Sequence, residues 1–172
     1  YVTRGSVSAG VHKTGQKPVK SQGFHIYIGV NRADDVPRIG AVLFNRLWLL
    51  GLGYITISSA GTMLLRTPID AAVFSPERLD FAGKPVIKSD GLQYTPPEVI
   101  YHPGQLLDTS QIKDLTDNEM TEVKRLQAEA KRVMADEADN VRADWELTHR
   151  AKLEDQGASA NEIEVAMSRI GA

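Results

Sequence analysis

The stretch KSQGFHIYIGV, Lys20–Val30, decides how the chain is expected to fold. A polar loop leads into FHIYIGV, where apolar residues alternate with others, and this is the period of a strand with two different faces. Phe24 and Ile26 then share one face, and His25 and Tyr27 share the other. The alternation therefore predicts a strand that carries a histidine opposite its apolar side.

The residues after this strand predict a helix and two further strands. An acidic pair before Val36-Pro37 is a helix-start signal, the apolar spacing from Ile39 to Leu50 is helical, and glycines follow. YITIS, residues 54–58, and TMLLRTPID, residues 62–70, read as strands joined by a turn. The order β-α-β-β predicts an α/β or α+β unit whose sheet is covered on one side by a helix.

The rest of the chain is expected to differ from this core. Residues 75–111 contain five prolines and several turn signals, which predicts an irregular segment. Beyond it, Thr116 and Glu119 form a capping box before a helical apolar stripe, and Ser159 and Glu162 repeat the pattern. We therefore expect a core over residues 1–111, followed by a helical segment over residues 112–172.

Composition narrows the class of protein. The chain has 172 residues and no Cys, and lacks an apolar run long enough to span a bilayer, so a cytoplasmic protein without membrane contact is expected. The net charge is −2, yet every charged residue before Asp34 is basic. This basic stretch, which includes Lys20, is consistent with an anionic ligand, but charge alone favours a solvated basic loop.

Strand parity brings three candidate residues onto one face. If the apolar residues pack on the helix, His25, Arg66 and Asp70 lie together on the open side of the sheet. The two cations suit a phosphate, the carboxylate suits a divalent metal, and Ser21 with the backbone at Gly23 would add hydrogen-bond donors. The plainer alternatives are a surface histidine, an exposed ion pair between Arg66 and Asp70, and a turn that begins at the aspartate.

Two runs of the sequence resemble a known family. SQGFHIY resembles the second motif of the archaeo-eukaryotic primase superfamily, and LLRTPIDAAVFSPERLDFAG resembles the third motif of its plasmid- and phage-type primase–polymerases. The resemblance, over roughly residues 5–90, implies an RRM-like core of an α+β fold. It implies that His25 and Ser21 bind the triphosphate, and that Asp70 is a ligand of Mg²⁺ or Mn²⁺. Lys20, Gly23, Arg66 and Arg78 are the further nucleotide-binding candidates.

One element of the family pattern is not found. Its first motif, a strand with two acids, should precede the histidine, but the first acid here is Asp34. Either the acidic strand lies upstream of Tyr1, or the chain is a degenerate member of the family. Because the sequence begins with Tyr1 rather than Met, we expect a C-terminal part of a catalytic domain whose acidic strand lies upstream. Alone, with only Asp70, the chain is expected to be inactive.

These features predict a nucleotidyltransferase that joins NTPs or dNTPs on a DNA template during replication of a plasmid or phage, with a helicase or other replication domains following residue 172. A non-catalytic module that binds nucleotide or single-stranded DNA, with Tyr27 and Tyr54 as stacking residues, is the alternative from another class. A protein-interaction adaptor that works through the acidic helices from residue 116 onward is the third.

Overall fold

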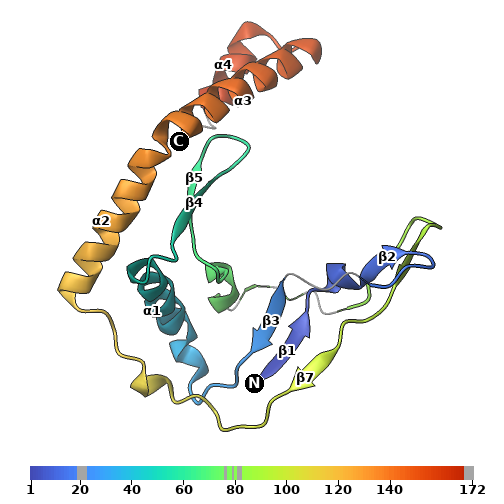
Figure 1. Ribbon diagram of the computed structural model, residues 1–172. Helices are drawn as coiled ribbons and strands as arrows, with labels where there is room; N and C mark the ends of the chain where they lie inside the picture. Colours follow the sequence, from blue (N-terminus) through green and yellow to red (C-terminus); the bar gives the residue numbers. More distant parts are fainter. Residues whose placement is uncertain (19–22, 76, 79, 81–82, 169–172) are drawn as a thin grey trace. The chain divides into compact units, whose positions relative to one another are not determined.

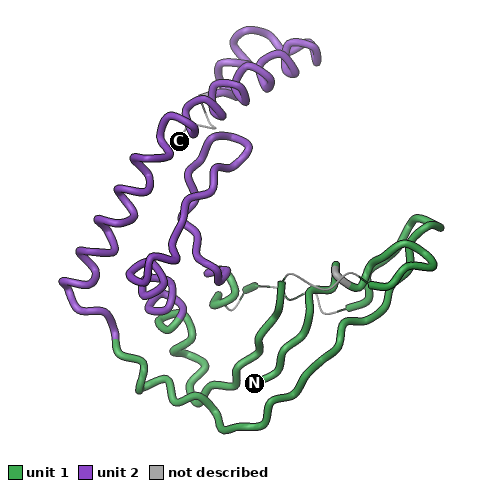
Figure 2. Tube along the Cα trace, in the orientation of Figure 1, with its two compact units in different colours: residues 1–39, 72–113 green, residues 40–71, 114–172 purple. Residues whose placement is uncertain are grey.

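The computed structural model describes residues 1–18, 23–75, 77–78, 80 and 83–168. The chain forms two compact units, coloured separately in Figure 2. The first contains residues 1–39 and 72–113, and the second contains residues 40–71 and 114–172. The predicted division at residue 111 stays a prediction.

The first unit contains a three-stranded antiparallel sheet in the order β3-β1-β7 (Figure 1). Its strands are β1 (Val2–Gly5), β3 (Phe24–Tyr27) and β7 (Val99–Tyr101). The predicted strand that begins at Phe24 is therefore confirmed, although it ends at Tyr27. As the central strand, β1 has both of its edges hydrogen-bonded to neighbours.

A second, two-stranded sheet of this unit pairs β2 (Val11–Lys13) with β6 (Leu92–Tyr94). Both β6 and β7 lie in the segment predicted to be irregular, so that prediction is wrong for these residues. Each of these strands has three residues, too few to show a clear alternation. Their pairing with strands far away in the sequence, rather than their own pattern, makes them strands.

Short 3₁₀ helices connect several of these elements. They are η1 (Val7–Gly10), η2 (Ala33–Asp35), η3 (Ala71–Phe74) and η4 (Thr109–Gln111). The last is capped by Asp108, whose side chain accepts a hydrogen bond from the Ser110 amide.

The second unit contains most of the helices. Helix α1 (Val36–Leu49) begins in the first unit and confirms the helix predicted before Gly51. The hairpin of β4 (Tyr54–Ile57) and β5 (Met63–Arg66) follows it. The remaining elements are α2 (Asp117–Val133), α3 (Ala135–Asp155) and α4 (Ala160–Ser168).

Apolar residues of several elements are buried in the second unit. Trp48 of α1 is 3% exposed, and Val123 of α2 and Ala138 of α3 are each 1% exposed. The hairpin turn approaches α3 closely, since a Cβ atom at Gly61 would lie 2.5 Å from the Cβ of Arg142. Gly61 has φ of 76°, a conformation that glycine adopts without strain.

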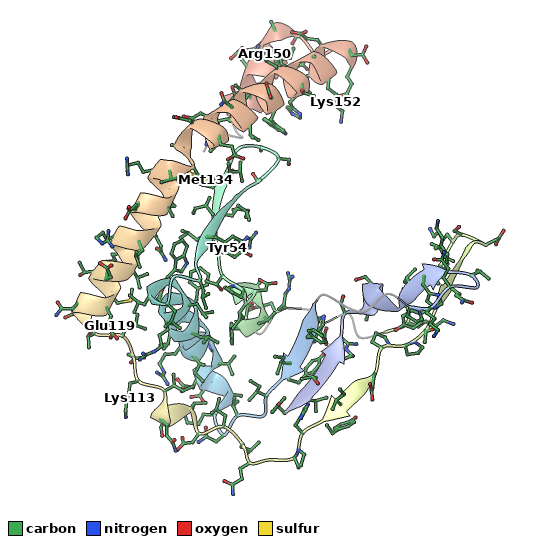
Figure 3. The ribbon with its side chains drawn as sticks, viewed as in Figure 1. Tyr54, Lys113, Glu119, Met134, Arg150 and Lys152 are labelled. Carbon is green, nitrogen blue, oxygen red and sulfur yellow. The ribbon has the colours of Figure 1, made fainter. Side chains whose placement is uncertain are left out.

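Both predicted capping boxes are formed. Glu119, labelled in Figure 3 at the start of α2, accepts a hydrogen bond from the Thr116 amide at 2.7 Å, and its own amide donates to the Thr116 hydroxyl at 3.3 Å. Glu162 and Ser159 make the same two bonds at 2.8 and 3.4 Å before α4. These local signals worked because a capping box needs only residues three apart.

The α+β class is confirmed, but the specific RRM-like arrangement is not. Among the described strands, β3 belongs to one sheet, and β4 and β5 form another. Phe24 and Ile26, predicted to pack beneath a helix, are 64% and 60% exposed. None of the helices in the described part of the chain has the length and apolarity needed to cross a bilayer.

Candidate functional site

The register of β1 and β3 places a cation opposite the candidate histidine. Arg4 pairs with His25, and Val2 pairs with Tyr27. Residues directly opposite each other in an antiparallel pair project from the same face, and so do residues two apart on one strand. Arg4, His25 and Tyr27 therefore share a face, as the alternation predicted for the last two.

A carboxylate from another part of the first unit completes a group of four side chains, here called the Asp80 cluster: Arg4, His25, Tyr27 and Asp80. Asp80 Oδ1 lies 3.3 Å from Arg4 Nη2 and 3.3 Å from His25 Nδ1. The Tyr27 hydroxyl donates to Asp80 Oδ2, and it accepts a hydrogen bond from Arg4 Nη2 at 2.9 Å. Three donor groups thus meet at one carboxylate.

The aromatic rings hold these donors side by side. The His25 and Tyr27 rings are nearly parallel, at an interplanar angle of 18° and a centroid distance of 6.2 Å. The Arg4 guanidinium carbon lies 5.8 Å from the Tyr27 ring centroid, within the range of a cation–π interaction. Alternate residues on one strand and their partner on the next therefore form a contiguous polar patch.

Burial differs across the cluster. The Arg4 side chain is 10% exposed, whereas those of His25 and Asp80 are 41% and 36% exposed. Burial, and next the hydrogen bond to Asp80, raises the pKa of the Tyr27 hydroxyl, so this group stays a proton donor at neutral pH. His25 faces the Asp80 carboxylate through Nδ1, so this ring nitrogen is the one placed to donate to it.

This geometry suits the binding of an anion. Guanidinium, imidazole and hydroxyl groups all donate hydrogen bonds, and bonds from charged donors to an oxyanion are among the stronger ones in proteins. A buried guanidinium is retained when an anion or other acceptors compensate it. The cluster can therefore receive a carboxylate, as it does here, or another oxyanion of similar size.

Four other residues predicted for this site lie close to His25 or Asp80 in the sequence: Lys20, Ser21, Gly23 and Arg78. Lys20 and Ser21 lie outside the described residues. Gly23 directly precedes β3, and its carbonyl accepts a hydrogen bond from the Ser6 amide at 3.1 Å. Arg78 is an exposed residue of the same unit, two positions before Asp80, and its amide donates to the Ser75 carbonyl at 3.1 Å. Their roles in binding stay predictions.

Arg66 and Asp70 belong to the second unit, so their proximity to His25 stays a prediction. Strand β5 ends at Arg66, whose Nε lies 3.4 Å from the Thr56 hydroxyl. The predicted strand over residues 62–70 is therefore too long. Thr67 turns the chain, since its hydroxyl donates to the Ile69 carbonyl and accepts from the Ile69 amide. Strand parity consequently does not extend to Asp70, which is exposed.

Metal binding by Asp70 was the other predicted role. Among the described residues, no three acidic or histidine side chains gather where they could hold a metal ion. Mg²⁺ is often held by one or two carboxylates together with water and substrate phosphates, so metal binding by Asp70 stays a prediction. We therefore assign no chemical step to a metal.

Sequence reasoning missed two members of the Asp80 cluster. Arg4 stands in the short strand VTRG, and its alternation could have shown that it projects from one face together with Val2. Asp80 lies in the proline-containing segment outside any helix or strand, 76 residues from Arg4 and 55 from His25 by their numbers. No local pattern could have predicted that contact.

Comparison with known proteins adds no relative. The chain matches no known family, no curated protein and no solved structure.

Proposed function

We propose that this chain is part of a primase–polymerase-type nucleotidyltransferase, and that Arg4, His25 and Tyr27 bind the phosphates of an NTP or dNTP. The observation that carries the proposal is the convergence of these three donors on one carboxylate. A phosphate presents the same kind of acceptor oxygen with more negative charge. The resemblance of SQGFHIY to a triphosphate-binding motif supports the same role for His25.

In the proposed reaction, the 3′-hydroxyl of a strand paired with a DNA template loses its proton to solvent and attacks the α-phosphorus, and the bond to the leaving pyrophosphate breaks. The residues of this chain would hold the triphosphate and stabilise the negative charge on the leaving group. Arg4 can do so because a guanidinium is cationic and offers several donors in a planar fork that matches phosphate oxygens. Asp70 remains the residue proposed to contact Mg²⁺ or Mn²⁺, in a site that needs further acidic ligands.

The alternative, a non-catalytic module that binds nucleotide or single-stranded DNA, is favoured by one further observation. Tyr27 and Tyr101 both pair with Val2 in the sheet, so they share the face of Arg4 and His25. Tyr101 is 75% exposed, which leaves its ring accessible to a base. Aromatic rings beside basic groups are the usual platform for single-stranded nucleic acid.

The first test is a calorimetric titration with a dNTP for the native chain and for His25→Ala. Loss of a hydrogen bond to a charged group costs on the order of 1.5–3 kcal/mol, so we expect the Kd to rise about tenfold or more. His149→Ala is the matched control, because His149 also stacks on an aromatic ring, that of Trp145. An unchanged Kd for His25→Ala would remove the phosphate-binding role.

The second test separates the two functions. Extension of a DNA primer is measured together with the binding of a single-stranded oligonucleotide. If the protein is the enzyme, the intact protein, with its further acidic ligands, extends the primer in a metal-dependent reaction that Asp70→Asn abolishes. The binding module predicts no extension, oligonucleotide binding that survives Asp70→Asn, and weaker binding for Tyr101→Ala.

A further inference from the structure

Asp80 uses the same donor hydrogens that a phosphate would need. His25 Nδ1 and the Tyr27 hydroxyl can each donate one hydrogen, and both groups contact Asp80. Arg4 Nη2 carries two hydrogens, and it contacts the Tyr27 hydroxyl at 2.9 Å and Asp80 Oδ1 at 3.3 Å. These hydrogens cannot be given to a second anion while the Asp80 carboxylate is in place.

The two ion pairs of Asp80 are also suited to exchange, and its hydrogen bond from the Tyr27 hydroxyl is the contact that displacement has to break. The contacts to Arg4 and His25 are both 3.3 Å, longer than the roughly 2.7–2.9 Å of a strong charge-assisted bond. The Asp80 side chain is 36% exposed and stands outside every described helix and strand. Water can therefore solvate the carboxylate when it leaves its donors, and no sheet hydrogen bond has to break.

We infer that Asp80 is an internal competitor of the triphosphate: its carboxylate occupies the position of a phosphate between Arg4, His25 and Tyr27, and a binding triphosphate displaces it. This inference rests on the proposed function and adds a regulatory element to the same site. A carboxylate with one negative charge holds the buried guanidinium while the ligand is absent. A triphosphate, with several charges, replaces it.

The consequence is a measurable gain of affinity when Asp80 loses its charge. The apparent affinity of a site is reduced by the fraction of molecules in the closed state, so removal of the competitor restores it. We expect Asp80→Asn to lower the Kd for inorganic tripolyphosphate, measured by calorimetry without divalent metal, by about threefold or more. Asp80→Ser is the second variant, and circular dichroism shows whether each one is folded.

The matched control is Glu77→Gln. Glu77 is an exposed carboxylate three residues before Asp80, and its hydrogen-bond partner is Ser75 rather than a member of the cluster. The substitution removes the same charge from the same segment without changing contacts to the donors. The inference is supported if Asp80→Asn raises the affinity for tripolyphosphate clearly more than Glu77→Gln does. An equal effect of the two overturns it.

Two further outcomes separate this inference from the proposed function. If Asp80→Asn weakens binding while His25→Ala also weakens it, Asp80 orients the donors, and the inference fails although the phosphate site stands. If His25→Ala leaves the Kd for tripolyphosphate unchanged in both the native and the Asp80→Asn background, both proposals fail. If Asp80→Asn raises the affinity for a DNA oligonucleotide but not for tripolyphosphate, the ligand that competes with Asp80 is a nucleic-acid backbone, and the inference is overturned.

A measurement on the native chain tests displacement without any variant. Isotope-edited NMR follows the carboxyl carbon of Asp80 and the Nδ1 of His25 while tripolyphosphate is added. Displacement predicts that both signals shift along the same binding curve. A shift of His25 with a constant Asp80 signal overturns the inference.

Discussion

Arg4 and His25 are direct partners across two antiparallel strands, and both reach the same oxygen of Asp80. This relationship turns an ordinary sheet surface into a group of donors that surround one anion. Because Arg4 is 10% exposed and His25 is 41% exposed, the guanidinium forms the inner part of the cluster and the imidazole its outer part.

The pKa of Tyr27 should respond to its two charged neighbours in opposite directions. Burial raises it most, Asp80 raises it further, and Arg4 lowers it. Asp80→Asn should therefore lower the pKa of Tyr27, and Arg4→Gln should raise it, as read from the ring carbon shift in an NMR titration from pH 8 to 12. Arg4→Lys keeps the charge and is the control. A shift in the same direction for both substitutions would contradict the described contacts.

Acid should destabilise the first unit through Asp35. The Arg38 guanidinium, aided by the Thr109 hydroxyl, lowers the pKa of Asp35 from 3.8 to about 2. A carboxylate with a lowered folded-state pKa contributes stability above its ordinary value, and the contribution is lost as the pH falls from 3.8 toward 2. Asp35→Asn should therefore flatten the dependence of the denaturant midpoint on pH in this window.

The control for this titration is Asp34→Asn. Arg32 pairs with Asp34 at 2.9 Å, but both side chains are more than 60% exposed, so solvent screens the pair. Asp34→Asn should therefore change the pH dependence of the denaturant midpoint less than Asp35→Asn does. The partner of Asp35, Arg38, also donates to the carbonyls of Thr109 and Ile112 and so connects η4 to the start of α1. Parallel curves for the native chain and Asp35→Asn would show that the pair makes no contribution.

Gly61 should be intolerant of a side chain for two reasons. Its φ of 76° is unfavourable for other residues, and a Cβ atom would lie 2.5 Å from Arg142 Cβ and 2.7 Å from the Ala138 carbonyl oxygen. Gly61→Ala should lower the free energy of unfolding by about 2 kcal/mol or more, since both strain and overpacking are added. Chemical denaturation monitored by tryptophan fluorescence measures the change.

Gly51→Ala separates the two causes. Gly51 has a similar φ of 73°, but nothing lies within 4 Å of the position of an added Cβ. Its substitution should therefore cost only the backbone term, on the order of 1 kcal/mol. Equal losses at both positions would mean that the hairpin moves away from α3 without cost.

The capping box of α2 should contribute to the stability of the second unit. Thr116→Ala removes the acceptor of the Glu119 amide and should cost about 1 kcal/mol in a denaturation experiment. Thr121→Ala is the control, because the Thr121 hydroxyl only donates to the Asp117 carbonyl inside the helix. If Thr121→Ala lowers the free energy of unfolding as much as Thr116→Ala does, the capping role of Thr116 is contradicted.

The sequence alone predicted those features that nearby residues determine. The span of α1, both capping boxes and the shared face of His25 and Tyr27 all follow from spacings of two to four residues. Helical hydrogen bonds, caps and strand alternation connect close neighbours, so their signals remain readable in a single chain.

Only the tertiary structure decided which strands pair and which carboxylate faces the histidine. The pairing of β1 with β3 and β7 sets Arg4 opposite His25, and a contact across 76 residues adds Asp80. Such long-range pairing depends on the competition among all possible partners rather than on local spacing. The sequence therefore determined that a histidine faces outward from a strand, and the tertiary structure determined that it becomes one of the donors around the Asp80 carboxylate.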